Sequence, residues 1–178
     1  DSIPRRGKSA VELIDALGRE VHGLLVIGSN IAVSAPDAVH VEGRLASLKL
    51  LVVADFFLSE TAQLADVVLP SAQWAEEDGT MTNLEGRVIR RRRAVAAPEG
   101  VRTDIQILCG LADALGKRHA FAFDGSAAVF EELRKATRGG PADYSGITYE
   151  RLDDSDGIFW PCPSVDHPGT PRLFASTF

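Results

Sequence analysis

The chain has 178 residues, of which 45% are hydrophobic and 25% charged, so its composition is that of a globular domain and excludes intrinsic disorder. With 19 basic against 25 acidic side chains, the formal net charge is −6, which excludes a general attraction to nucleic acid or anionic membranes. No apolar run approaches the roughly 20 residues that span a bilayer.

The start of the chain and its cysteines indicate a reduced, cytoplasmic piece of something longer. Asp1 to Arg6 carries a twin arginine without an apolar stretch close behind it, which is not the pattern of a signal peptide. Because an initiator methionine is also missing, we expect a processed or excised chain. Cys109 and Cys162 are too few for a disulfide framework or a four-thiolate iron–sulfur cluster.

The first half of the chain predicts alternating helices and strands. Ser9 and Glu12 form an S-x-x-E capping box at the start of a helix that runs through Ala16 and ends near Gly18. Continuous apolar runs predict strands, and such runs are typical of parallel strands covered on both faces. The three strands and the helix between the first two are expected at residues 24–27, 50–53, 67–69 and 37–47. We therefore predict an α/β fold with three αβα layers and a mainly parallel sheet of the dinucleotide-binding type.

Three loops follow these strands, at the sheet edge where parallel α/β proteins bind ligands. In the loop Gly28-Ser29-Asn30, the glycine permits a tight turn and the other two residues are polar. This loop either contacts a ligand or is a plain polar turn. Asp55 ends the second strand, where a carboxylate can accept from a sugar hydroxyl or a guanine edge, or can cap the next helix. Pro70-Ser71 forms the third loop, and no G-x-G-x-x-G fingerprint is present.

After Ser71 the apolar runs give way to polar sequence. Residues 72–80 predict a loop with an acidic turn, and residues 88–95 an extended surface segment. The four arginines Arg90–Arg93 either clamp an anionic group or a neighbouring domain's carboxylates, or form a solvated charged segment.

Two helices and a long irregular segment complete the prediction. Thr103 is expected to cap a helix that ends at Leu115, and Ser126 to begin another that ends near Thr137. The residues expected to face inward from these helices are Ile105, Leu108, Cys109, Ala112, Leu115, Val129, Phe130 and Leu133. Residues 138–178 are rich in glycine and proline, so we predict a loop-rich docking segment with a domain boundary after residue 137.

Several segments together resemble a known family. They are GLLVIGSN, LLVVADFFLSETAQLADVVLP, SAQWAEEDGTMTNLEGRVIRRRRAV, TDIQILCGLADALG and GIFWPCPSVDHPGTPRLF. In this order, over about residues 3–174, they are similar to the catalytic subunits of bacterial molybdenum oxidoreductases. The segment QWAEEDGTMTNLEGR is most similar to assimilatory nitrate reductases, with formate dehydrogenases of the same family as the alternative.

The resemblance implies that residues 1–137 form a domain that binds a pterin guanine dinucleotide. The whole enzyme would carry molybdenum on two such dinucleotides, bis-molybdopterin guanine dinucleotide, and a 4Fe-4S cluster would lie in an N-terminal region absent here. Its partners would be the other domains of the parent chain and an electron-donor protein or domain, with no nucleic acid or membrane. The piece alone would be inactive. A freestanding nucleotide-binding module is a second interpretation, and a domain whose arginines dock an acidic partner is a third.

The resemblance also implies which residues contact the cofactor. These are Gly28, Ser29, Asn30, Ala54, Asp55, Glu77 and Asp104. The glycine loop would line one dinucleotide, and the other residues would surround its guanosine end. Ile31 stands where the family usually has proline, which predicts a less rigid turn. Glu77 stands where lysine is frequent, so we expect a guanine or ribose contact there instead of a phosphate contact. No catalytic residue or metal ligand is identifiable.

Overall fold

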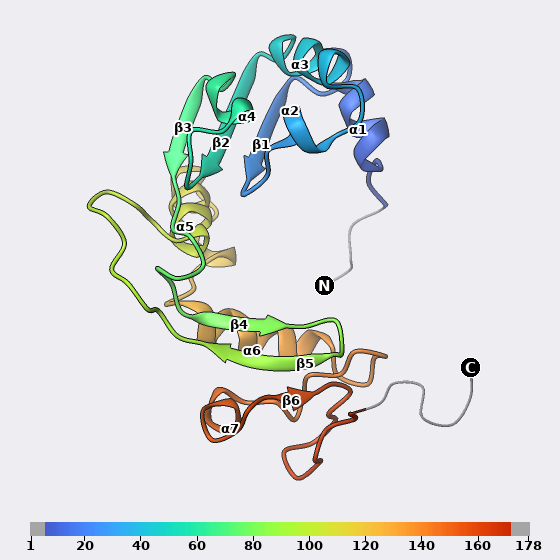
Figure 1. Ribbon diagram of the computed structural model, residues 1–178, viewed down its shortest axis with the longest axis vertical. Helices are drawn as coiled ribbons and strands as arrows, with labels where there is room; N and C mark the ends of the chain where they lie inside the picture. Colours follow the sequence, from blue (N-terminus) through green and yellow to red (C-terminus); the bar gives the residue numbers. More distant parts are fainter. Residues whose placement is uncertain (1–5, 172–178) are drawn as a thin grey trace. The chain divides into compact units, whose positions relative to one another are not determined.

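The computed structural model describes residues 6–171, which form two compact units with a sheet in each (Figure 1). The first unit comprises the described residues up to Gln73 together with Pro98–Ile107, and the second comprises Trp74–Ala97 together with those from Leu108 onward. Residues 137 and 138, between which the sequence predicts a domain boundary, both lie in the second unit. The twin-arginine start and the end of the predicted docking segment lie mostly outside the described residues.

The first unit is built on a parallel sheet in the order β1-β2-β3, as the apolar runs predict. Its strands are β1 (Gly23–Ile27), β2 (Leu50–Asp55) and β3 (Val67–Pro70). Ile27 pairs with Ala54, and Asp55 pairs with Pro70, so the carboxyl ends of all three strands lie at one edge. Figure 1 shows the three arrowheads at this common edge. The α/β class is confirmed.

Short helices connect and cover these strands. They are α1 (Ala10–Ala16), α2 (Ile31–Ser34), α3 (Ala38–Ala46) and α4 (Glu60–Gln63). The capping box of α1 is confirmed, because the Ser9 amide donates to the Glu12 carboxylate at 2.7 Å and the Glu12 amide donates to the Ser9 hydroxyl at 3.4 Å. The single turn of α2 directly after Asn30 was not predicted from the sequence.

The core of the first unit lies on one face of its sheet. Alternate strand residues such as Val26, Leu51 and Val53 are buried there against helix residues such as Leu45. On the opposite face Leu50 keeps 48% of its surface exposed, because the described residues cover that face only in part. The covered face anchors the ends of β1 and β2, and therefore fixes the loops that follow them.

The second unit contains an antiparallel sheet in the order β4-β5-β6. Its strands are β4 (Gly79–Thr82), β5 (Arg87–Arg91) and β6 (Ile158–Phe159). The prediction of a loop throughout residues 72–80 is wrong for β4, which pairs with β5 through Gly79 and Arg91. The prediction of an extended segment is confirmed for β5, but Val88 is fully buried, so this strand is not a surface segment throughout.

The second unit contains several helices and a small core. They are α6 (Ser126–Ala136), α7 (Tyr149–Asp153), the 3-10 turn η1 (Arg118–Ala120) and most of α5 (Asp104–Ala114), which begins in the first unit. The core, to which α6 and α7 contribute, consists of Val88, Phe130, Ile147, Leu152, Ile158 and Cys162.

Some predicted inward-facing residues of these helices point outward. Leu115 is 67% exposed, Leu133 40% and Val129 36%, so the prediction is wrong for them, whereas Phe130 is buried as predicted. Helical spacing identifies an apolar stripe, but it does not say how much of the stripe is covered. Both cysteines are free thiols, Cys162 buried and Cys109 half-buried.

Candidate functional site

The loop after β1 contains a glycine in the left-handed region. Gly28 has φ +57°, which favours glycine, and its amide donates to the carbonyl of Ala54 on the neighbouring strand at 2.8 Å. Apart from chain neighbours, no heavy atom of the described residues lies within 4 Å of where a Cβ on Gly28 would stand. The backbone of Gly28-Ser29 is therefore open to a ligand at the carboxyl edge of the sheet.

The side-chain amide of Asn30 is held at both ends by α4. Its Nδ2 donates to Glu60 Oε2 at 2.6 Å, and its Oδ1 accepts from the backbone amide and the hydroxyl of Thr61 at 3.1 and 2.9 Å. An asparagine amide has two donor hydrogens and two acceptor sites on its oxygen. These contacts use both acceptor sites and one donor hydrogen, so one N–H is left for a ligand.

The carboxylate of Asp55 holds the turn after β2. Asp55 is 8% exposed, its Oδ1 accepts from the Phe56 amide at 2.8 Å, and its Oδ2 accepts from the Ser59 hydroxyl at 2.8 Å. The alternative that Asp55 caps the next helix is wrong, because the N-cap of α4 is Ser59, and Asp55 instead holds the turn that leads to it. A carboxylate has about four acceptor sites, so this role leaves acceptor capacity for a guanine or ribose donor.

Asp104 belongs to the same unit as these loops. The segment before it runs beside the end of β3, where Arg102 N donates to Pro70 O at 3.2 Å and Ala72 N donates to Arg102 O at 2.9 Å. Asp104 begins α5 directly after this segment. The first unit thus contains six of the seven sequence-predicted residues, and five of them lie in the adjoining ends of β1 and β2.

Glu77, the seventh, lies in the second unit and is paired with an arginine. Its Oε1 accepts from Arg91 Nη2 at 2.8 Å. This contact gives Glu77 a role in holding the β4–β5 hairpin, and the described contacts do not bring it together with the other six residues.

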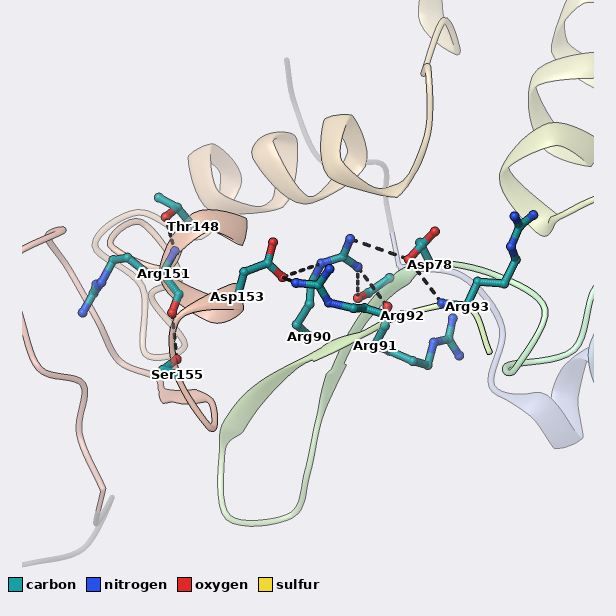
Figure 2. A network of polar contacts seen from close by, with 10 residues as sticks. Asp78, Arg90, Arg91, Arg92, Arg93, Thr148, Arg151, Asp153 and Ser155 are labelled. Atoms are coloured by element: carbon teal, nitrogen blue, oxygen red, sulfur yellow. Dashed lines mark hydrogen bonds and ion pairs between the residues drawn. The ribbon is translucent and has the colours of Figure 1, made fainter. Parts of the chain in front are cut away.

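The other arginines of the run differ in exposure. Arg90 Nε lies 3.4 Å from Asp153, and Arg90 Nη2 lies 3.7 Å from Asp78 (Figure 2). The Arg90 guanidinium also lies 4.2 Å from the centre of the Tyr149 ring. The solvated-segment alternative is therefore wrong for Arg90 and Arg91, whereas the Arg92 side chain is 67% exposed. The carboxylates that Arg90 and Arg91 bind belong to their own unit.

Sequence analysis did not assign Glu60 and Thr61, which bind Asn30, or Ser59, which binds Asp55, to the site. Ser59 does cap α4, since its hydroxyl accepts from the Ala62 amide, at a long 3.4 Å. The pKa of Glu60 is lowered by hydrogen bonding from its own backbone amide and from the Asn30 amide, so Glu60 is a charged acceptor at neutral pH. The signal was the sequence Ser59-Glu60-Thr61 itself, three polar residues directly after an apolar turn.

Comparison with known proteins identifies the family. The family model described as molybdopterin oxidoreductase matches residues 3–114. The chain belongs to the molybdopterin oxidoreductase family.

Individual relatives support this assignment. The chain is 48% identical over 179 residues to the assimilatory nitrate reductase catalytic subunit of Bacillus subtilis, covering 100% of this chain and 25% of that protein. It is 45% identical over 170 residues to a formate dehydrogenase alpha subunit of Methanococcus maripaludis, covering 96% of this chain and 24% of that protein. Acetylene hydratase from Pelobacter acetylenicus shares the fold, with a TM-score of 0.67 at 19% identity, over 93% of this chain and 24% of that one. The chain thus spans about a quarter of the length of these relatives.

Membership of the molybdopterin oxidoreductase family implies a molybdenum–pterin cofactor. The residues at the carboxyl edge fit such a cofactor, because the open turn at Gly28 leaves space for it, although the Gly28 amide itself already donates to the Ala54 carbonyl. Asp55 and Asn30, from the two adjoining loops, offer acceptors and a donor for a base or sugar.

Proposed function

We propose that this chain binds the guanosine end of a pterin guanine dinucleotide within a molybdenum-dependent nitrate reductase that converts nitrate to nitrite. The proposal rests mainly on one observation: the entire chain is 48% identical in sequence to an assimilatory nitrate reductase. The open Gly28 turn beside Asp55 supports it independently, because it combines space for a diphosphate with a carboxylate for a guanine edge.

In this proposal each predicted residue binds or orients the cofactor. The backbone of Gly28 and Ser29 faces the diphosphate, and Asn30 contributes its remaining N–H. Ala54, Asp55 and Asp104 surround the guanosine, and Glu77 adds a base or ribose contact. When bound, the cofactor supplies the oxygen-atom transfer chemistry, while the protein fixes its position and electronic surroundings.

The proposal extends to the protein that contains this chain. We propose a cytoplasmic enzyme with bis-molybdopterin guanine dinucleotide, a 4Fe-4S cluster outside this segment, and an electron-donor protein or domain. Nucleic acid and membrane are not among its proposed partners. No helix within residues 6–171 combines the length and hydrophobicity that crossing a membrane requires.

Activity of the full-length protein tests the proposed reaction. Purified protein supplied with reduced viologen is expected to consume nitrate and to leave formate unoxidised. The second candidate is formate oxidation, which the 45% identity to a formate dehydrogenase favours. Formate oxidation without nitrate reduction would assign the protein to that activity, and full-length protein free of molybdenum and pterin would favour a simple nucleotide-binding module.

The proposed site is tested with Asp55→Asn in the full-length protein. Asparagine retains an oxygen for the Phe56 amide and an amide group that can donate to Ser59, so the substitution removes mainly the charge. We expect the guanine nucleotide released per protein to fall about tenfold, the scale of one lost charge-assisted hydrogen bond. Glu42→Gln, an exposed position on α3, is the matched control and is expected to retain the wild-type content.

A further inference from the structure

Three consecutive side chains of the Ser59–Thr61 turn connect the two loops of the proposed site. Ser59 donates to Asp55 Oδ2, Glu60 accepts from Asn30 Nδ2, and Thr61 donates to Asn30 Oδ1. Asp55 ends β2 and Asn30 lies in the loop after β1, so this turn holds two segments that are far apart in sequence. The turn is therefore a fixed point to which both loops are attached.

Thr61 is the most constrained member of this turn. It is fully buried, and its hydroxyl donates to Asn30 Oδ1 at 2.9 Å while accepting from the Ala32 amide at 3.0 Å. The Ala32 amide lies in the first turn of α2, where backbone amides lack partners within the helix. One hydroxyl thus fixes both the Asn30 side chain and the helix that follows the glycine turn.

These contacts also determine which way the Asn30 amide points. Its oxygen faces two donors from Thr61, and its nitrogen faces the Glu60 carboxylate. A reversed amide would place the nitrogen against the donors of Thr61 and the oxygen against a carboxylate, and both contacts would be unfavourable. The single N–H left for a ligand therefore has a fixed direction.

We propose that Thr61 is a positioning residue for the cofactor: it raises affinity for the guanine dinucleotide by fixing the Asn30 side chain, without touching the cofactor. This inference rests on the proposed function. Its distinguishing feature is that Thr61 acts through Asn30, since its own side chain is fully buried.

The test compares Thr61→Val with Thr61→Ser in the full-length holoenzyme. Valine keeps the branched shape but loses the hydroxyl, whereas serine keeps the hydroxyl. We expect the pterin guanine dinucleotide to dissociate about tenfold faster from Thr61→Val than from the wild type. From Thr61→Ser its dissociation rate is expected to stay within about twofold of the wild-type rate. The measurement is molybdenum and guanine nucleotide retained after timed dilution and gel filtration. Thr148→Val, the control, removes another helix-capping hydroxyl, in the second unit. The cofactor is expected to dissociate from this variant at the wild-type rate.

A double-mutant cycle separates positioning from general stability. In an Asn30→Ala background, Thr61→Val is expected to have less than about a twofold further effect, because the group through which it acts is gone. A tenfold effect of Thr61→Val on cofactor dissociation in that background would overturn the proposal. So would an unchanged dissociation rate in Thr61→Val alone, or equally fast dissociation from Thr61→Ser and Thr61→Val. Wild-type protein that binds no pterin would instead overturn the proposed function, and this inference with it.

Discussion

Both units have a buried apolar core, but the second also depends on arginines that connect distant segments. In the first unit, buried aliphatic side chains from successive strands and helices pack together, as Val26, Leu45 and Val53 do. In the second unit, arginines connect segments that are far apart in the chain. Arg90 of β5 reaches Asp153 and Tyr149 of α7, and Arg134 Nη2 of α6 donates to the Ser145 carbonyl at 2.6 Å.

This difference predicts how each unit responds to substitution. An aliphatic core relaxes partly around a change and distributes its cost over many contacts. In the second unit, where arginine contacts add to a small core, the loss of one arginine removes several partners at once. Hydrogen exchange of backbone amides in the full-length protein reports the two units separately, because each unit contributes its own peptides.

Gly146→Ala is expected to have the largest effect. A Cβ at Gly146 would lie 1.9 Å from the backbone carbonyl oxygen of Ser164, and the Gly146 amide also donates to the Cys162 carbonyl at 2.6 Å. Because backbone atoms form the obstacle, we expect a loss above about 4 kcal/mol, seen as rapid exchange throughout the second unit. Gly43→Ala in α3 is the control: apart from chain neighbours and the local helix backbone, no heavy atom of residues 6–171 lies within 4 Å of the added Cβ, and a gain of up to about 1 kcal/mol is expected. A small effect at Gly146 would contradict the close approach.

Arg90→Ala is expected to have the second largest effect. The side chain of Arg90 is 16% exposed and donates to the carbonyls of Gly79 and Arg91 at 2.9 Å, besides contacting Asp153 and the Tyr149 ring. Its removal leaves partly buried acceptors without a cation, so we expect a loss of about 2–4 kcal/mol in exchange protection of the β4–β5 hairpin.

The neighbouring Arg92→Ala is the matched control for Arg90. Its side chain is 67% exposed and pairs with the same Asp153 at 2.9 Å, and such exposed pairs contribute less than about 1 kcal/mol. Equal losses from the two substitutions would show that the hairpin does not depend on the buried arginine.

The same difference explains what the sequence could predict. The strands of the first unit follow from runs of neighbouring residues, and the position of Gly28 and Asp55 follows from where these runs end. In contrast, β4 is recognisable only through its pairing with β5, and its short sequence has no apolar run. The orientation of Leu115 depends on what covers α5, which helical spacing does not contain.

The sequence likewise predicted only some residues of the candidate site. Residues that point to a ligand by their chemistry and by their place at a strand end, such as Asn30 and Asp55, could be selected from the sequence. Glu60 and Thr61 stand out only as polar residues after an apolar turn, and their contacts to Asn30 could not be predicted, because these exist only after the sheet brings two loops together. The pairing of Glu77 with Arg91 likewise depends on the register of a hairpin that the sequence did not predict.

Acidification is expected to have the smallest effect and to act on the second unit. The pKa of Asp143 is lowered by hydrogen bonding from the Ser145 side chain and from the Ser145 and Gly139 amides. Because its folded-state pKa lies below the unfolded value, the unfolded state binds more protons between the two values, and stability rises with pH across that range. The contribution is therefore complete above about pH 4, near the unfolded pKa of an aspartate, and is lost as the pH falls below it.

We therefore expect exchange protection around residues 139–145 to decrease below about pH 4, after correction for intrinsic exchange rates. Asp143→Asn removes the titrating group and is expected to make this region's protection independent of pH in that range. Asp113→Asn, an exposed carboxylate in the same unit, is expected to leave the acid response unchanged. If the decrease persisted in Asp143→Asn, another group would control the acid response, and Asp143 would not be the group through which pH acts on this segment.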